Sequence, residues 1–182
     1  MDNIGIIILA AGASTRLGQP KQLLLYQGKP LIEQITAVAI HSGCQPVVVV
    51  LGAYAARIQP QLRHLGVHIA FNEQWSNGMA SSLQCGLRKI RAIAPNLDAV
   101  MIMLCDQPFV SASLIQQFVT GYQTSNSLIV ASQYNQIVGV PALFDQTLFS
   151  ELAAIEGDVG ARGIIRRHDA KVLKIPFAEG AI

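Results

Sequence analysis

Residues 4–21 of the chain read IGIIILAAGASTRLGQPK. The first seven of these residues form a continuous apolar run rich in isoleucine, which is typical of a strand buried on both faces of a parallel sheet. Small residues and glycines follow at once, and the stretch ends with Pro20 and Lys21. We therefore expect a strand that leads into a tight turn, and in α/β proteins such turns lie at the ligand-binding edge of the sheet.

The alternation of apolar runs with segments of helical length continues along the chain. Strands are predicted over 4–10, 46–51, 67–71, 98–104, 128–131 and 171–175, and helices over 30–41, 53–65, 78–93, 111–122, 145–154 and 160–168. This order predicts an α/β fold, a three-layer α/β/α sandwich with a mostly parallel sheet. The chain has 182 residues and no internal repeat or linker, so we expect a single domain over 1–182.

Composition excludes several classes of protein. Hydrophobic residues make up 51% of the chain and charged residues 13%, but each apolar run is far shorter than the ~20 residues of a membrane-crossing helix. A net charge of +2 without a long basic cluster argues against a nucleic-acid partner. The N-terminus lacks the basic start of a signal peptide, and three widely spaced cysteines suggest no disulfide framework. We expect a cytoplasmic protein with no membrane partner.

The turn after the first strand has the chemistry of a phosphate-binding loop. Its small residues let the backbone approach a ligand closely, its N–H groups can hold phosphate oxygens, and Arg16 and Lys21 supply positive charge. The turn fits neither the P-loop pattern nor the Gly-x-Gly-x-x-Gly pattern of dinucleotide-binding proteins, so those classes lose support. From spacing alone, an ordinary solvated turn fits equally well.

Two carboxylates follow later elements and are candidates for binding a metal ion. Asp106 comes directly after a buried strand, where it is well placed to hold Mg²⁺, a cation that needs oxygen ligands. Asp158 lies near a predicted helix start and could share a metal with Asp106. The alternative role for each carboxylate is to cap the N-terminus of a helix. Asp106 fits that role poorly, because several residues separate it from Ser111. For Asp158, capping a helix and binding a metal fit equally well.

The segment 72–82 follows the third predicted strand and leads into a helix. Gly78 and Ser82 could hydrogen-bond a base or a ribose, and Trp75 could pack beside them. Ordinary helix initiation with Trp75 in the core explains the same residues, and chemistry alone favours that alternative.

Taken together and in this order, these segments resemble the nucleotidyltransferases of the molybdenum cofactor family, the MobA-like NTP transferases, and most closely the cytidylyltransferase branch. The opening motif of the family is matched by Leu9 to Gly12, Arg16, Gly18 and Lys21. An Asp-x-Pro motif is matched by residues 106–108, and later motifs by residues of 72–82, by 139–141 and by 157–162.

The resemblance implies a Rossmann-like nucleotidyltransferase fold, the fold of nucleotide-diphospho-sugar transferases, and a Mg²⁺-dependent reaction. The enzyme would join the NMP of an NTP to a phosphorylated acceptor, molybdenum-loaded molybdopterin, and release pyrophosphate. It implies catalytic roles for Arg16, Lys21 and Asp106, and Mg²⁺ binding by Asp106 and Asp158. It implies nucleotide binding by Leu9, Ala10, Ala11, Gly12, Ser14, Arg16, Lys21, Gly78 and Ser82. Cytidylyltransferases tend to carry alanine at the position of Ala11, where guanylyltransferases carry glycine, so CTP is favoured over GTP.

Other functions stay open. The chain could be the guanylyltransferase of the same pathway, or a transferase for another phosphorylated acceptor. A different class is a non-catalytic carrier of nucleotide or cofactor, with a molybdoenzyme or its chaperone as partner. An NAD-dependent oxidoreductase is disfavoured, because the sequence lacks its glycine motif and has Leu51-Gly52-Ala53 where an acidic residue is expected.

Overall fold

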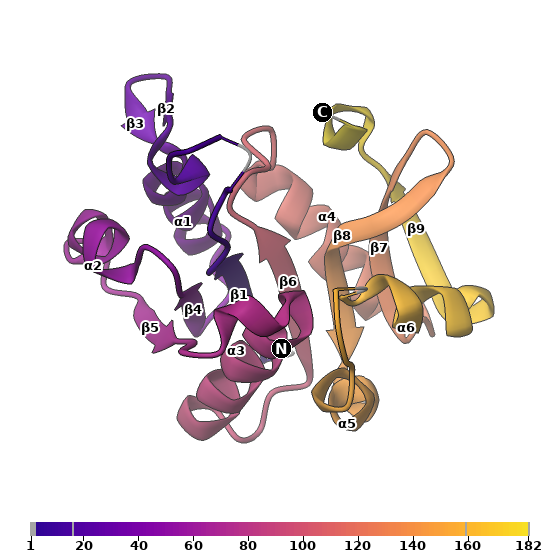
Figure 1. Cartoon of the computed structure of the whole chain (residues 1–182). Helices are drawn as coiled ribbons and strands as arrows, with labels where there is room; N and C mark the ends of the chain where they lie inside the picture. The colour runs from indigo at the N-terminus through magenta and orange to yellow at the C-terminus, as the bar shows by residue number, and fades with distance from the viewer. Residues whose placement is uncertain (1–2, 16, 159, 182) are drawn as a thin grey trace.

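The computed structural model describes residues 3–15, 17–158 and 160–181. Its centre is a seven-stranded sheet with the order β5-β4-β1-β6-β8-β7-β9 (Figure 1). The strands are β1 (Ile4–Ala10), β4 (Val47–Leu51), β5 (His68–Phe71), β6 (Ala99–Leu104), β7 (Ile129–Tyr134), β8 (Ile137–Asp145) and β9 (Val172–Pro176). Four of the six pairings are parallel, and the two that involve β8 are antiparallel. The expected α/β sandwich with a mostly parallel sheet is confirmed.

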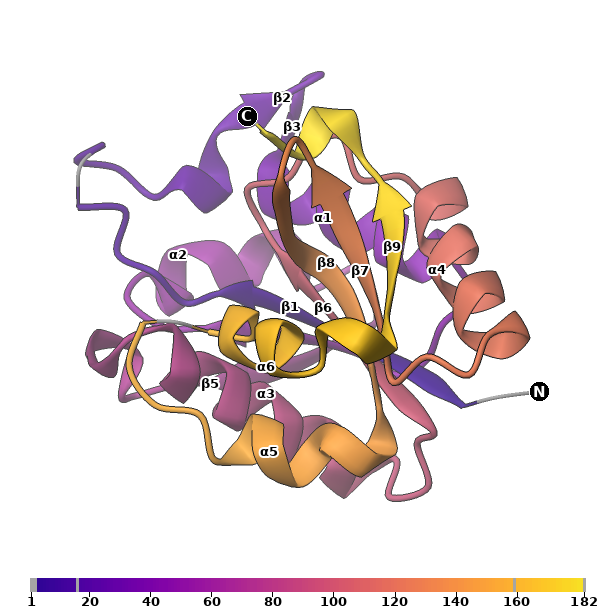
Figure 2. The ribbon, with the colours of Figure 1, turned by 90° about the vertical axis from the view of Figure 1, so that its right-hand side faces the viewer.

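Helices cover both faces of the sheet (Figure 2). One apolar layer joins the sheet to α1 (Leu31–His41), α2 (Ala55–Ile58) and α4 (Ala112–Thr124). The other joins it to α3 (Met79–Ile93), α5 (Phe149–Ala153) and α6 (Arg162–Arg167). Successive strand residues point to opposite faces, so Ile6 and Ile8 enter the first layer while Ile7 and Leu9 enter the second. This two-sided burial explains why β1 is apolar throughout.

Helix α3 packs against the sheet through Gly86. A β-carbon added at Gly86 would lie 2.6 Å from the Ile7 Cγ2 and 2.8 Å from the Val50 Cγ2, which leaves no room for a larger residue. This contact fixes α3 over β1 and β4. The N-terminus of the helix is thereby held beside the carboxyl ends of these strands.

The predicted helix over 53–65 is wrong. Its residues form the short helix α2 and the 3₁₀ helix η2 (Gln59–Leu62), because Pro60 has no N–H to continue an α-helix. The predicted helix over 145–154 begins as the 3₁₀ helix η4 (Gln146–Leu148) and becomes α-helical at α5. Pro30 precedes α1 instead of occupying its first turn.

Strand β8 was not predicted at all, although it lies between β6 and β7. Its Gly139 and Pro141 are residues that usually weaken or end strands. The sheet accommodates them with a register shift in β7 between Ala131 and Ser132, and the Ser132 hydroxyl donates to the Pro141 carbonyl at 2.9 Å. A small antiparallel pair, β2 (Leu25–Tyr26) with β3 (Lys29–Pro30), was also missed.

Across 3–15, 17–158 and 160–181, no helix combines the length and the apolar character that crossing a bilayer requires.

Candidate functional site

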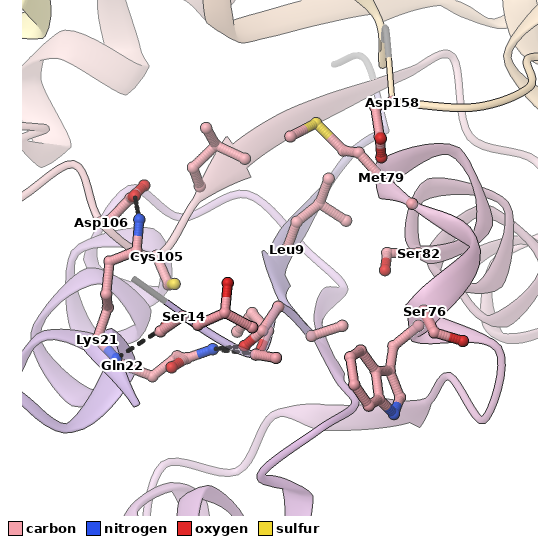
Figure 3. Close-up of a pocket in the computed structure, with 18 of the residues that line it drawn as sticks. Leu9, Ser14, Lys21, Gln22, Ser76, Met79, Ser82, Cys105, Asp106 and Asp158 are labelled. Atoms are coloured by element: carbon pink, nitrogen blue, oxygen red, sulfur yellow. Dashed lines mark hydrogen bonds and ion pairs between the residues drawn. The ribbon is translucent and has the colours of Figure 1, made fainter. Parts of the chain in front are cut away.

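A pocket of about 840 Å³ opens at the carboxyl ends of β1 and β6 (Figure 3). Its walls come from the turn after β1, the 3₁₀ helix η1 (Lys21–Leu23), the start of α3, the residues after β6 and Asp158. The sequence-predicted residues among its lining are Leu9, Ala10, Ala11, Gly12, Ser14, Lys21, Gly78, Ser82, Asp106 and Asp158. Arg16, the remaining predicted residue, lies outside the described residues. Segments distant in sequence therefore meet at one cavity.

An ion pair between Lys21 and Asp106 lies at one side of the pocket. The Lys21 Nζ is 3.1 Å from the Asp106 Oδ2, and the two side chains are 43% and 37% exposed. Exposed ion pairs are weak, about 0–1 kcal/mol. Both charges can therefore turn to a bound ligand at little cost, the ammonium to a phosphate and the carboxylate to a cation.

The turn after β1 is tied by hydrogen bonds to two residues of η1, Lys21 and Gln22. We name residues 11–15 the phosphate-binding loop. The Gln22 side-chain amide donates to the carbonyls of Ala10 and Gly12, both at 2.9 Å, and the Lys21 backbone N–H donates to the Ser14 hydroxyl at 3.1 Å. Gln22 is only 2% exposed. Its role was missed, because nothing in the sequence pattern shows that this amide returns to the turn.

The start of α3 is built around Gly78, which has a φ of +94°. A β-carbon there would collide with the Oδ1 of Asp158 and lie 3.1 Å from the Gly157 carbonyl oxygen. Glycine is therefore required both by its conformation and by the close approach of the chain around Asp158. The Ala80 N–H donates to the Gly157 carbonyl at 3.1 Å, which joins this segment to the first turn of α3.

The Asn72 side chain organises the next turn of α3. Its amide donates to the Ser81 hydroxyl at 2.9 Å and to the Ser82 hydroxyl at 3.0 Å. Ser82 is buried and lines the pocket, so its hydroxyl faces the cavity with one acceptor position already used. Its remaining hydrogen-bonding capacity suits a ribose or a base.

Apolar side chains flank the polar groups. Trp75 is 36% exposed and Met79 is 40% exposed, and both line the pocket. The core position considered for Trp75 is wrong, because the side chain lies at the pocket wall. Its Cβ is beside Gly52, where an added β-carbon would lie 2.7 Å from it. A flat apolar surface of this kind suits an aromatic ring.

The donor chemistry fits a hard divalent cation that arrives with phosphates. Asp106 and Asp158 line the same pocket and are seen at different sides of it in Figure 3. Among the described residues, no group of three or more His, Cys, Asp or Glu side chains gathers as a metal site. Mg²⁺ is commonly held by one or two carboxylates together with substrate phosphates, so isolated carboxylates are compatible with it.

Cys105 lines the pocket as a buried thiol. Burial, reinforced by the neighbouring charge of Asp106, raises the pKa of the Cys105 thiol to about 12. The thiol therefore stays protonated at neutral pH, and the reactive form of cysteine is the thiolate.

The chain matches one protein family and resembles relatives whose names give different activities. A family model described as MobA-like NTP transferase domain matches residues 6–172. The Nicotine blue oxidoreductase of Paenarthrobacter nicotinovorans is 32% identical over 170 residues, which cover 88% of this chain and 80% of that protein. The Molybdenum cofactor guanylyltransferase of Xanthomonas euvesicatoria pv. vesicatoria is 31% identical over 121 residues, 64% of this chain and 54% of that protein.

Solved structures match the whole fold. The crystal structure of Rv0371c from Mycobacterium tuberculosis H37Rv superposes with a TM-score of 0.85 at 29% identity, and the match covers 97% of this chain and 88% of that one. The same protein has also been solved as a complex with manganese.

Proposed function

The chain belongs to the MobA-like NTP transferase domain family, and from this premise we propose the specific reaction of this nucleotidyltransferase. It joins the NMP of an NTP to a phosphorylated acceptor with the help of Mg²⁺. The favoured nucleotide is CTP, and the acceptor is molybdenum-loaded molybdopterin. The observation that carries the proposal is the Lys21–Asp106 pair beside the phosphate-binding loop, in one pocket with the start of α3.

The chemistry is a substitution at the α-phosphorus of the nucleotide. An oxygen of the acceptor phosphate forms a bond to that phosphorus, and the bond to the oxygen bridging the α- and β-phosphates breaks, so pyrophosphate leaves. The attacking phosphate is already anionic at neutral pH, so we assign no general base. Such a reaction needs placement and charge neutralisation more than a protein nucleophile.

Each role falls to a pocket residue or to Arg16. Gly12, Ser14, Arg16 and Lys21 would hold the triphosphate, and the Lys21 ammonium would balance charge on the departing pyrophosphate. Asp106 would hold Mg²⁺, with Asp158 proposed as a second ligand, and the cation would neutralise phosphate charge. Leu9, Ala10, Ala11, Gly78 and Ser82 would contact the base or ribose.

The preference for CTP rests on Ala11. A β-carbon added at Gly52 would lie 2.9 Å from the Ala11 Cβ, so the Ala11 methyl group fills the space beside Gly52. A glycine at position 11 would leave that space open at the pocket wall. We also propose that residues 1–182 act as one domain in the cytoplasm and pass the product to a molybdoenzyme or its chaperone.

A second candidate is suggested by the relative from Paenarthrobacter nicotinovorans, which is named an oxidoreductase and matches most of this chain. It predicts a redox reaction, which oxidation of NADH in the presence of an added dye would detect. A non-catalytic carrier predicts nucleotide binding without turnover.

The deciding experiment measures pyrophosphate release from CTP, GTP and ATP with Mg²⁺, with and without molybdenum-loaded molybdopterin. Acceptor-dependent release from CTP alone supports the cytidylyltransferase. Preferred release from GTP keeps the mechanism but removes the CTP assignment, and release with another phosphorylated acceptor alone removes molybdopterin. Oxidation of NADH without release of pyrophosphate favours the oxidoreductase.

A further inference from the structure

We infer that Gln22 is a positioning residue that holds the phosphate-binding loop in the shape that binds nucleotide. The inference rests on the proposed function, since it assumes that the loop receives a triphosphate. Gln22 is buried beside the loop and is not one of the residues to which the proposed reaction gives a role. It contributes its contacts through a neutral amide, so its part differs from the charge neutralisation assigned to Lys21.

The two hydrogen bonds of Gln22 determine how the loop backbone is oriented. The Gln22 Nε2 donates to the carbonyls of Ala10 and Gly12, which lie on either side of Ala11. In a trans peptide the N–H points opposite to the carbonyl of the same unit. The N–H groups of Ala11 and Ala13 therefore point away from Gln22. Neither has a hydrogen-bond acceptor among the described residues.

This arrangement separates acceptors from donors at the loop. Two carbonyl oxygens, which would repel phosphate, are turned to a buried amide, and two N–H groups are left for phosphate oxygens. No other side chain among the described residues donates to either carbonyl. Loss of the amide would remove the side-chain donor of the buried Ala10 carbonyl and of the part-buried Gly12 carbonyl, and would free these peptide units to rotate.

The Gln22 geometry also makes a pH-dependent test available. The Gln22 Oε1 is buried and has no hydrogen-bond partner in the described part of the chain. In Gln22→Glu, a protonated carboxyl group can still donate one hydrogen bond to the loop. The ionised group can donate none and places negative charge against two carbonyl oxygens. Burial and these oxygens favour the neutral form, so the variant should bind nucleotide best at low pH and lose binding as the pH rises.

The experiment measures the Kd of CTP by calorimetry between pH 5.5 and 8.5 for wild type and variants. The ratio of the Kd of Gln22→Glu to that of wild type should rise about tenfold or more across this range. The titration of the nucleotide affects wild type and variant equally, so it cancels in the ratio. The matched control is Gln84→Glu, because the Gln84 amide also donates to a backbone carbonyl, that of Ile155 at 2.8 Å, but does not line the pocket.

A second variant decides the matter if Gln22→Glu unfolds at high pH, which thermal melts at each pH would reveal. Gln22→Met keeps the length of the side chain but donates nothing, so its CTP affinity should be about tenfold weaker at every pH, with KM raised more than kcat is lowered. The inference would be overturned if the Kd ratio of folded Gln22→Glu to wild type did not change with pH, or if Gln22→Met bound CTP with wild-type affinity.

The outcomes separate this inference from the proposed function. Wild-type turnover with a flat Gln22→Glu ratio removes only the role of Gln22. CTP binding without pyrophosphate release removes the proposed reaction, while the binding data still decide the role of Gln22. Absence of nucleotide binding by the wild type removes both.

Discussion

The Lys21 ammonium and the Asp106 carboxylate, 85 positions apart in the chain, lie 3.1 Å from each other at one side of the pocket. More than a third of each side chain is exposed, so the pair adds little to folding stability. Substitutions at either residue should therefore report on ligand binding and turnover, with the fold left intact.

Asp106→Asn should lower kcat/KM for the nucleotide by about 100-fold or more, because an amide holds a divalent cation far more weakly than a carboxylate does. Its melting temperature should stay within a few degrees of wild type, and chelation by EDTA should abolish the wild-type activity reversibly. Asp169→Asn is the control, since Asp169 also pairs with a lysine, Lys174 at 2.8 Å, but does not line the pocket. Wild-type activity in Asp106→Asn would remove the mechanism as drawn.

Lys21→Ala should raise the KM for the nucleotide and lower kcat, with a combined loss of about 100-fold, because positive charge beside the phosphates is removed from ground and transition states. Steady-state kinetics over a range of nucleotide concentrations separate the two effects. Lys29→Ala removes an exposed lysine that pairs with Glu33 at 3.7 Å and should leave both constants unchanged. Equal losses in the two variants would indicate a general effect of net charge.

Gly78→Ala should destabilise the protein by about 1–3 kcal/mol, because alanine is strained at a φ of +94° and its methyl group would collide with Asp158. Gly66→Ala is the reference for alanine at a positive φ without a steric clash, since Gly66 has a φ of +65° and no atom within 4 Å of its added β-carbon. Urea denaturation should show the larger loss for Gly78→Ala, and nucleotide binding should fall in that variant only. Equal losses of stability would mean that neither the contact with Asp158 nor the backbone conformation of Gly78 adds strain beyond that at Gly66.

Glu151 should make stability depend on pH below about pH 4.5. Partial burial by itself would raise the pKa of Glu151, but hydrogen bonds from His168 and Arg167, together with their charge, outweigh burial and lower it. A lowered pKa means that the unfolded state binds more protons. The stabilisation is therefore complete above the unfolded pKa, near 4.5, and is lost as the pH falls through the folded pKa.

The variant Glu151→Gln checks this prediction by urea denaturation at pH 7, 5 and 3. Wild type should be more stable at pH 7 by about 1 kcal/mol, a modest value because the side chain is 30% exposed, and the difference should shrink at pH 3. Glu156→Gln, at an exposed site, is the matched control. A difference that stays constant down to pH 3 would contradict the assignment.

The sequence predicted the parts of the fold that are decided locally. Strand β1 has the predicted bounds, because a run of seven apolar residues suits a strand in a sheet covered on both faces. The helix expected over 111–122 is α4, and the Ser111 hydroxyl caps its N-terminus by accepting from the Leu114 N–H at 3.2 Å. Strand β8 was missed because its stability comes from β6 and β7 on either side, and Gly139 and Pro141 hide it in the sequence.

The residues of the candidate site also divide into those that the sequence predicts and those that only the folded chain brings together. Residues that directly follow strands, such as Asp106, were found because the sheet geometry places strand ends together. Gln22 was missed because its partners are backbone carbonyls. A turn that folds back to meet a side chain further along the chain leaves no periodic pattern in the sequence. The packing of Gly78 against Asp158 likewise depends on two turns that meet only in the folded chain.

The position of β8 in the sheet also bears on how the protein is made. On a ribosome, β6 emerges with β1 on one side, but its other edge waits for residues 137–145, which follow only after α4 and β7. An unpaired buried strand edge is prone to intermolecular pairing while it waits. The nascent chain is thus exposed to aggregation between the emergence of Leu104 and that of Asp145, and translation speed or chaperone supply over that interval should affect its yield.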